Sequence, residues 1–311
     1  MNKTALSIAD TFNLNVDKSI TVTGLSEPME YTPTYAYSDS YYFRKDLLRD
    51  IIAWWEFAPR GEGFYLTGPK GCGKSSLVLQ FLARLNWPCI AVTPHEHMEL
   101  SDLVGRPIVQ ADGSMAFQYG PLAEAARNGW VLLINELDAF DPSVSIGLNG
   151  VVEGEPLVIP ENGGEIIYPH PDFRIAATGN TKGDGDEGFY FGTNSQNAAF
   201  MDRFWAVNVD YMEKEAEMEI LKDKVSYDDA VIEKMVDFAN DVRRQYIEGD
   251  IDATMSTRVL IRFAQMTEYF YDVTKEDQNH FQYALFRAHF FLATPRVQAA
   301  IKELAQRYFG D

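Results

Sequence analysis

One stretch of the chain strongly limits how it can fold: the sequence GPKGCGKS at residues 68–75, a complete G-x-x-x-x-G-K-[ST] phosphate-binding loop. Its glycines let successive backbone N–H groups turn toward phosphate oxygens. Lys74 supplies a positive charge to the β and γ phosphates, and Ser75 offers a hydroxyl to Mg²⁺. The pattern therefore predicts a nucleoside triphosphate site.

The neighbours of this loop support that prediction. An apolar run at 64–67 precedes it, and apolar residues at helical spacing follow it. The order of strand, loop and helix aims a positive helix N-terminus at the phosphates, which disfavours the alternative of a glycine-rich turn without a ligand. The residues predicted to bind the nucleotide are Gly68, Pro69, Lys70, Gly71, Cys72, Gly73, Lys74, Ser75 and Ser76.

The composition favours a globular protein with a large core, since 46% of the 311 residues are hydrophobic and 13% are aromatic. The 46 acidic and 27 basic side chains give a net charge of -19. Such a charge repels a phosphate backbone unless the basic groups cluster. We therefore expect that nucleic acid is not a partner.

The cysteines and the lengths of the apolar runs indicate the cellular compartment of the protein. Cys72 and Cys89 are too few for the disulfide framework of a small secreted protein, and they suit a reducing cytoplasm. Residues 1–10 lack the apolar core of a signal peptide, and no run approaches about 18 apolar residues. These features predict a soluble cytoplasmic protein without a membrane partner.

Five apolar runs have the length and composition of buried strands. Because helical segments separate them, we expect an α/β fold with a parallel sheet and helices on both faces. The five runs are 64–67, 89–92, 131–134, 173–177 and 205–209.

Two other segments alternate around turn residues and are predicted to be β-hairpins. One covers 107–119 and turns at 112–113, and the other pairs 157–159 with 165–167 through 162–164. They are either plain surface structure or levers that contact another molecule.

The pattern divides the chain into three parts. Residues 1–44 have little helical period and predict an extended N-terminal arm, in which the aromatic cluster 41–43 packs on the core or near the adenine. Residues 45–212 form the nucleotide-binding domain, which opens with a helix over 44–57. Residues 213–311 are helical throughout and form a second lobe.

Polar side chains in the run 130–138 lie at the carboxyl end of a predicted strand, the edge at which ligands bind in a parallel α/β sheet. Glu136 is expected to polarise an attacking water, while Asn135 and Asp138 are expected near the Mg²⁺ that Ser75 also contacts. The alternative is a solvated acidic turn, which the phosphate loop upstream disfavours.

Three further residues are candidates for the chemistry. Asn180 ends the strand 173–177 on the same edge and is expected to bond the γ-phosphate or the lytic water. Arg203 precedes the last strand and is expected to reach a phosphate of a neighbouring subunit, with a surface salt bridge as the alternative. Arg258 opens a helix of the second lobe and means little by itself.

Together, the phosphate loop, the acidic strand end, the asparagine-tipped strand and the two arginines resemble the AAA+ ATPase module. The two hairpins resemble those of its MoxR-like branch. Within that branch the chain is similar to the ATPase subunit of aerobic cobaltochelatases, over residues 25–270. The segments that carry this similarity are 83–89, 102–105, 170–174, 188–193 and 201–203.

The resemblance implies a five-stranded parallel sheet in the order 5-1-4-3-2, two inserted hairpins and a helical lid. It also implies ATP and Mg²⁺ as cofactors and a homo-oligomeric ring, expected to be a hexamer, with ATP bound between subunits. The implied roles are Walker A for Lys74 and Ser75, the Walker B glutamate for Glu136, sensor 1 for Asn180, the arginine finger for Arg203 and sensor 2 for Arg258.

One position departs from the family, which carries aspartate where this chain has Asn135, so that a formal charge is missing beside Mg²⁺. The resemblance implies an ATP-hydrolysing motor that remodels a partner, either a chelatase large subunit or a protein with a von Willebrand A domain. The alternative raised by Asn135 is an ATP-binding assembly switch that hydrolyses little. A nucleic-acid motor is disfavoured by the charge.

Overall fold

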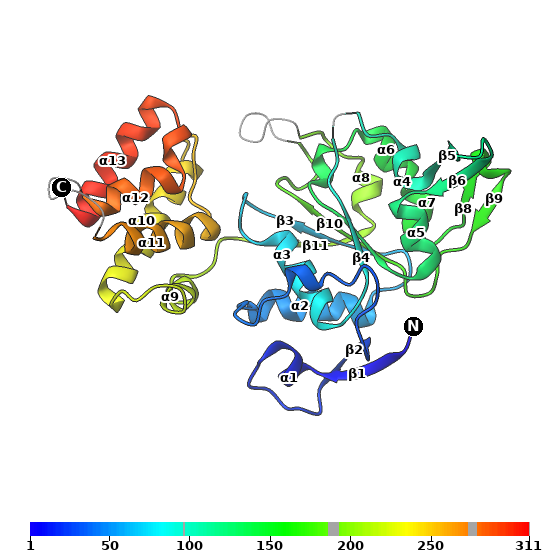
Figure 1. Ribbon diagram of the computed structural model, residues 1–311, viewed down its shortest axis with the longest axis horizontal. Helices are drawn as coiled ribbons and strands as arrows, with labels where there is room; N and C mark the ends of the chain where they lie inside the picture. The colour runs from blue at the N-terminus through cyan, green and yellow to red at the C-terminus, as the bar shows by residue number, and fades with distance from the viewer. Residues whose placement is uncertain (96, 186–192, 273–278, 311) are drawn as a thin grey trace. The chain divides into compact units, whose positions relative to one another are not determined.

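The computed structural model describes residues 1–95, 97–185, 193–272 and 279–310, which form two compact units (Figure 1). Unit 1 comprises Met1–Gly68 and Gly73–Val209, and unit 2 comprises Pro69–Cys72 and Asp210–Asp311. Of the segment 188–193, which contributed to the resemblance, all but Thr193 lies outside the described residues. Within the described ranges, no helix is long and apolar enough to cross a membrane.

A five-stranded parallel sheet forms the centre of unit 1, as predicted. Every residue of the third strand along the chain is apolar and buried, as expected of a strand that is covered on both faces of a parallel sheet. The strands lie in the order β11-β3-β10-β7-β4, which is 5-1-4-3-2 when they are counted along the chain. They are β3 (Gly63–Thr67), β4 (Cys89–Val92), β7 (Val131–Ile134), β10 (Arg174–Gly179) and β11 (Phe204–Asn208).

Neighbouring residues of β3 serve opposite faces of the sheet because side chains alternate along a strand. Phe64 stacks on Trp54 of α2 (Lys45–Phe57), with ring centroids 5.1 Å apart. Tyr65 belongs to the apolar cluster that contains α5 (Pro121–Asn128). The helix predicted over 44–57 is confirmed, and Trp54 is part of its buried face.

The first 44 residues contain regular structure where an extended arm was expected. The segment packs on α3 (Lys74–Arg84) and the residue that follows it: Phe12 stacks on Phe81 with centroids 5.7 Å apart, and the Leu25 N–H donates to the Leu85 carbonyl at 2.8 Å. Phe43 is buried edge-on against Phe12, which is core packing. The elements are β1 (Lys3–Ser7), α1 (Ile8–Phe12), β2 (Thr21–Leu25) and η1 (Thr34–Ala36).

Both predicted hairpins are confirmed, and they lie against each other (Figure 1). The first pairs β5 (Gly105–Val109) with β6 (Met115–Tyr119), and the second pairs β8 (Leu157–Ile159) with β9 (Glu165–Ile167). The Tyr119 hydroxyl donates to Glu165 Oε2 at 2.7 Å, and Asn162 Nδ2 donates to the same oxygen at 2.6 Å. The Tyr119 hydroxyl also accepts from Asn162 Nδ2 at 3.2 Å, so that two bonds of Tyr119 join the two insertions into one surface.

Short helices fill the remaining connections of unit 1. They carry apolar residues into the cluster under α5, including Phe140, Leu148 and Phe200. The helices are α4 (Leu100–Val104), η2 (Leu137–Ala139), α6 (Pro142–Gly147), α7 (Asn149–Val152), η3 (Pro160–Asn162) and α8 (Ala198–Met201).

Unit 2 is helical, as its apolar spacing predicts, and has its own core around Phe238 and Phe263. Polar side chains cap four of its helix N-termini, because the first N–H groups of a helix have no partner inside it. The helices are α9 (Lys214–Lys222), α10 (Asp229–Ile247), α11 (Thr257–Phe270), α12 (His280–Ala288), η4 (Phe290–Leu292) and α13 (Pro295–Phe309).

Candidate nucleotide site

Three glycines give the phosphate loop its shape. Gly68, Gly71 and Gly73 have φ angles of 144, 79 and 97°, a region that other residues rarely adopt. Helix α3 begins at Lys74, directly after Gly73. The loop therefore ends on a helix N-terminus, whose free N–H groups and dipole suit a phosphate.

Lys74 and Asn180 meet at the carboxyl edge of the sheet. The Lys74 side chain is largely buried, and its Nζ donates to the Gly68 carbonyl at 2.7 Å and to Asn180 Oδ1 at 3.1 Å. The amide that follows β10 thus lies beside the cation of the phosphate loop. Both groups are within reach of one phosphate.

Ser75 and Asn135 form the second pair at this edge. The Ser75 hydroxyl donates to Asn135 Oδ1 at 2.6 Å, which joins the first turn of α3 to the end of β7. Hydroxyl and carboxamide oxygens are hard donors that suit Mg²⁺ when phosphates and water complete its shell. Two of the three residues predicted beside the ion, Ser75 and Asn135, are therefore adjacent and of fitting chemistry.

Glu136 is exposed and has an unusual backbone conformation. Its φ of 54° lies in the left-handed region, which costs a residue with a side chain about 1–3 kcal/mol. The Glu136 N–H donates to the Thr178 hydroxyl of β10 at 3.2 Å. Strain of this kind persists where surrounding contacts impose it, and it is frequent at functional sites.

Asp138 is buried, with 1% of its surface exposed. Its Oδ2 accepts hydrogen bonds from the Asn180 N–H at 2.7 Å, the Thr181 N–H at 3.0 Å and the Thr181 hydroxyl at 3.2 Å. Within the described chain, its side-chain hydrogen bonds all go to this turn. Through Oδ2 the carboxylate thus braces the turn that carries Asn180, while its buried Oδ1 has no hydrogen-bond partner among the described residues. Its place near Mg²⁺ stays a prediction.

Arg203 is engaged within its own chain. Its Nε donates to Glu153 Oε1 at 2.8 Å, and its other guanidinium nitrogens contact Glu153 and the Ala199 carbonyl. The salt bridge weighed as the alternative for this residue is therefore present. Its side chain is 24% exposed, so the guanidinium is not sealed from solvent.

Arg258 belongs to unit 2, as the second residue of α11, and its side chain is exposed. Ser256 caps the same helix by accepting from the Val259 N–H at 3.2 Å. The cap fixes the first turn, on which Arg258 lies.

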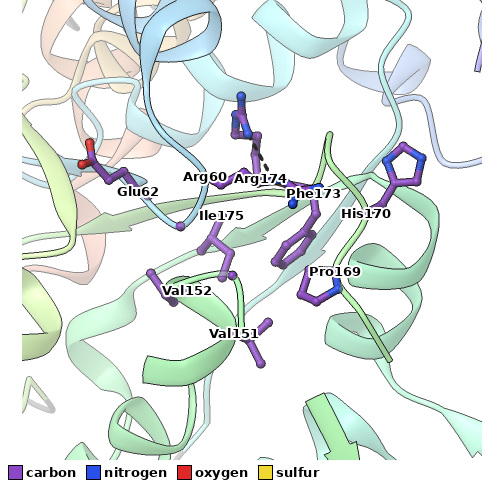
Figure 2. Close-up of a pocket in the computed structure, with 12 residues that line it drawn as sticks. Arg60, Glu62, Val151, Val152, Pro169, His170, Phe173, Arg174 and Ile175 are labelled. Carbon is purple, nitrogen blue, oxygen red and sulfur yellow. Dashed lines mark hydrogen bonds between the residues drawn. The ribbon is translucent and has the colours of Figure 1, made fainter. Parts of the chain in front are cut away.

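A separate pocket lies at the opposite edge of the sheet, where β3 and β10 begin (Figure 2). Arg174 and His170 contribute to its lining together with the apolar side chains of Phe173 and Ile175. Burial lowers the pKa of Arg174, and its Nε has no partner among the described residues. The pocket contains no residue of the phosphate loop and is distinct from the nucleotide site.

Sequence reasoning missed the supporting roles of two threonines. Thr178 bonds the Glu136 backbone, and the Thr181 carbonyl accepts the hydroxyls of Tyr65 at 2.7 Å and Thr67 at 2.6 Å. The polar run 178–181 was visible in the sequence. Its roles depend on β10 lying between β3 and β7, which no local pattern reports.

The fold and the loop geometry define the AAA+ class of P-loop ATPases. Residues 63–204 match the family described as AAA domain (dynein-related subfamily), and residues 217–308 match the CbbQ/NirQ/NorQ C-terminal family. A mutant of RuvB from Thermotoga maritima has the same fold at a TM-score of 0.53, with 16% identity over 86% of this chain and 77% of that chain.

Three relatives show to which branch of the AAA+ ATPases the chain belongs. The aerobic cobaltochelatase subunit CobS of a Sinorhizobium species is 33% identical over 281 residues, 87% of this chain and 82% of that protein. Protein CbbQ of Hydrogenophilus thermoluteolus is 30% identical over 197 residues, 63% of this chain and 70% of that protein. NirQ of Stutzerimonas stutzeri is 28% identical over 201 residues, 65% and 70% of the two chains. The chain therefore belongs to the MoxR-like AAA+ ATPases, together with CobS and CbbQ.

Proposed function

We propose that this protein hydrolyses ATP to remodel or activate a partner protein. The observation that most supports this is the convergence of two polar pairs at one sheet edge, Lys74 with Asn180 and Ser75 with Asn135. Glu136 follows Asn135 directly and is exposed, as a residue that polarises water must be.

Each residue then has a role. Lys74 neutralises the β and γ phosphates, Ser75 and Asn135 hold Mg²⁺, and Asn180 orients the γ-phosphate or the attacking water. Glu136 accepts the proton of that water as it attacks. Bound Mg²⁺ would supply electrostatic stabilisation of the phosphate charge. Asp138 acts on Asn180 by holding its backbone.

Membership of this family supports a proposal for the assembly and for the partner. We propose a hexameric cytoplasmic ring in which Arg203 completes the neighbouring subunit's site and Arg258 contacts the nucleotide of its own or a neighbouring subunit. The partner is a chelatase large subunit or a protein with a von Willebrand A domain. The relative named as a cobaltochelatase subunit supports metal insertion as one version of this function.

A second candidate function is an ATP-binding switch with low turnover. It is favoured by the neutral Asn135, which accepts a bond from Ser75 where the family has a carboxylate. Both functions require ATP binding, and only the first requires hydrolysis that rises with the partner.

The test measures ATP affinity and phosphate release for the wild type and Lys74→Ala, with and without a candidate partner. The motor predicts binding and partner-stimulated release by the wild type, with loss of binding in Lys74→Ala. Binding without release, even with a partner that forms a complex, would favour the switch. Equal affinity of the two proteins for ATP would overturn both functions.

A further inference from the structure

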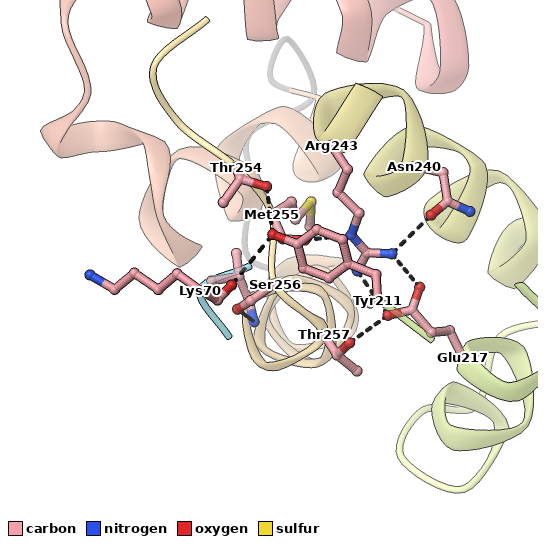
Figure 3. A network of polar contacts seen from close by, with 10 residues as sticks. Lys70, Tyr211, Glu217, Asn240, Arg243, Thr254, Met255, Ser256 and Thr257 are labelled. Atoms are coloured by element: carbon pink, nitrogen blue, oxygen red, sulfur yellow. Dashed lines mark hydrogen bonds and ion pairs between the residues drawn. The ribbon is translucent and has the colours of Figure 1, made fainter. Parts of the chain in front are cut away.

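Unit 2 contains a buried ion pair (Figure 3). The Arg243 guanidinium of α10 donates to both carboxylate oxygens of Glu217 on α9, at 2.7 and 2.8 Å. The two side chains are 3% and 0% exposed. Such burial is costly unless the remaining hydrogen-bonding groups are also paired, so the other contacts of the pair define its role.

One of those other contacts stays within α10, where Arg243 donates to Asn240 Oδ1 at 2.8 Å, and two others hold the start of α11. Arg243 Nε donates to the Met255 carbonyl at 2.7 Å, and the Thr257 hydroxyl donates to Glu217 Oε1 at 2.6 Å. The residues on both sides of the helix cap are therefore bonded to one ion pair. The next residue along the chain is Arg258.

Tyr211 extends this network to the phosphate loop. Its ring lies 4.4 Å from the Arg243 guanidinium carbon, in the geometry of a cation–π contact. Its hydroxyl is 3.0 Å from Thr254 Oγ1 and donates to the Lys70 carbonyl in a long bond of 3.4 Å. Because a phenol has one proton, Thr254 donates to Tyr211 while Tyr211 donates to Lys70.

Two observations agree with this arrangement. Burial raises the pKa of the Tyr211 hydroxyl above its usual value, so it keeps the proton that it donates. Independently, Gly71 lies so close to Ser256 that a Cβ atom at position 71 would overlap the serine side chain. The middle of the phosphate loop therefore packs on the segment that leads into α11.

We propose that Tyr211 is a positioning residue of the ATP site, which ties the Lys70 carbonyl of the phosphate loop to the first turn of α11 and so sets the place of Arg258 before ATP binds. The proposal rests on the proposed ATP site. Its physical basis is preorganisation: without the tie, the ordering of α11 against the loop must be supplied by the binding of ATP.

The test compares Tyr211→Phe with Tyr227→Phe. Both substitutions remove one hydroxyl from unit 2, and the Tyr227 hydroxyl is buried without a hydrogen-bond partner among the described residues. We expect Tyr211→Phe to weaken ATP affinity about 2- to 10-fold, the effect of one hydrogen bond, with an unchanged unfolding midpoint. Tyr227→Phe should bind ATP as the wild type does.

A double-mutant cycle with Arg258→Ala separates positioning from general support of the fold. If Tyr211 acts by placing Arg258, its substitution changes ATP affinity less than about twofold in the Arg258→Ala background. Additive effects would overturn the proposal, as would wild-type affinity in Tyr211→Phe, whether or not its unfolding midpoint falls. The affinity of Lys74→Ala separates failure of this proposal from failure of the proposed function. If the wild type and Lys74→Ala bind ATP equally, the proposed function fails too; if only the wild type binds ATP, the failure concerns Tyr211 alone.

Discussion

Glu136 is the residue on which we propose that hydrolysis depends in this site. It combines exposure, a left-handed backbone and a position one residue beyond the Ser75–Asn135 pair. We predict that Glu136→Gln binds ATP with wild-type affinity but releases phosphate slower by a factor on the order of 10² or more, because the amide cannot accept the proton of the attacking water.

Single-turnover phosphate release and equilibrium ATP binding check this prediction. Glu155→Gln is the matched control, since Glu155 is an exposed glutamate of unit 1 outside the nucleotide site. Equal turnover in Glu136→Gln and the wild type would remove Glu136 from the mechanism.

Asn135 is a neutral residue at the proposed Mg²⁺ site. We predict that Asn135→Asp raises phosphate release or lowers the Mg²⁺ concentration needed for half-maximal release, because a carboxylate stabilises the hydrated ion better than an amide does. A magnesium titration of both proteins measures this. A fall in release would mean that Asn135 is matched to Ser75, which donates to its oxygen.

Glu217 is fully buried in unit 2, where it pairs with the buried Arg243. We predict that Glu217→Ala lowers the free energy of unfolding of unit 2 by about 3–5 kcal/mol, because it leaves the Arg243 guanidinium buried without its partner. Denaturant unfolding followed in the helical signal measures the change. Glu219→Ala on the same helix is the control: its partner Lys222 is a surface residue, so the expected change is below about 1 kcal/mol.

At the scale of elements, the two hairpins form one surface with exposed apolar side chains. Val158 and Ile166 face each other across the second hairpin and are 54% and 50% exposed. The hairpins also lie along the chain just before β7 and β10, whose carboxyl ends carry Asn135 and Asn180. We propose that a shift at the γ-phosphate passes through β10 to the second hairpin, and through β7 and α5 to the first.

We predict that the double substitution Val158→Thr and Ile166→Thr keeps basal ATP hydrolysis within about threefold, around 0.7 kcal/mol, and abolishes stimulation by the partner. Threonine keeps the strand while removing apolar surface. These positions are better probes than the tip, where Gly163 and Gly164 have φ angles of 66 and 77° that alanine would strain.

The matching substitutions on the other hairpin, Val109→Thr and Met115→Thr, report which insertion the partner contacts, since this pair is exposed and cross-strand as well. Full stimulation in both double mutants would place the output surface elsewhere, on the helical unit.

At the scale of the whole molecule, the proposed role of Arg203 concerns whether one subunit is a complete enzyme. Its bond to Glu153 within the chain is exposed to solvent and therefore weak, so the guanidinium can exchange this partner for a phosphate. If it serves the neighbouring site, hydrolysis rises more steeply than linearly with protein concentration, and Arg203→Ala binds ATP without hydrolysing it.

Mixing Arg203→Ala with Lys74→Ala is the decisive measurement. Each variant is expected to be inactive alone, and a mixed ring contains sites in which an intact Lys74 faces an intact Arg203. Recovered hydrolysis would support a shared site. No recovery in rings verified to contain both variants would make Arg203 a structural residue.

The sequence alone determined the class and the edge of the sheet at which the chemistry lies. The phosphate loop, the apolar strands and the hairpin turns are local patterns, and each reports a conformation that its own residues prefer. Because parallel strands carry their ligands at the carboxyl end, the same patterns predict that Lys74, Asn135 and Asn180 lie at one edge, where the structure has them.

Only the tertiary structure decided what the supporting residues do. Asp138 was assigned by its nearness in sequence to Asn135, yet its oxygen bonds the turn of another strand, 42 residues away. The pairing of Glu217 with Arg243 and the contact of Tyr211 with Lys70 join segments 26 and 141 residues apart. Periodicity describes how a segment folds on itself, whereas the partner of a buried polar group is chosen by whichever distant segment packing brings within hydrogen-bonding distance.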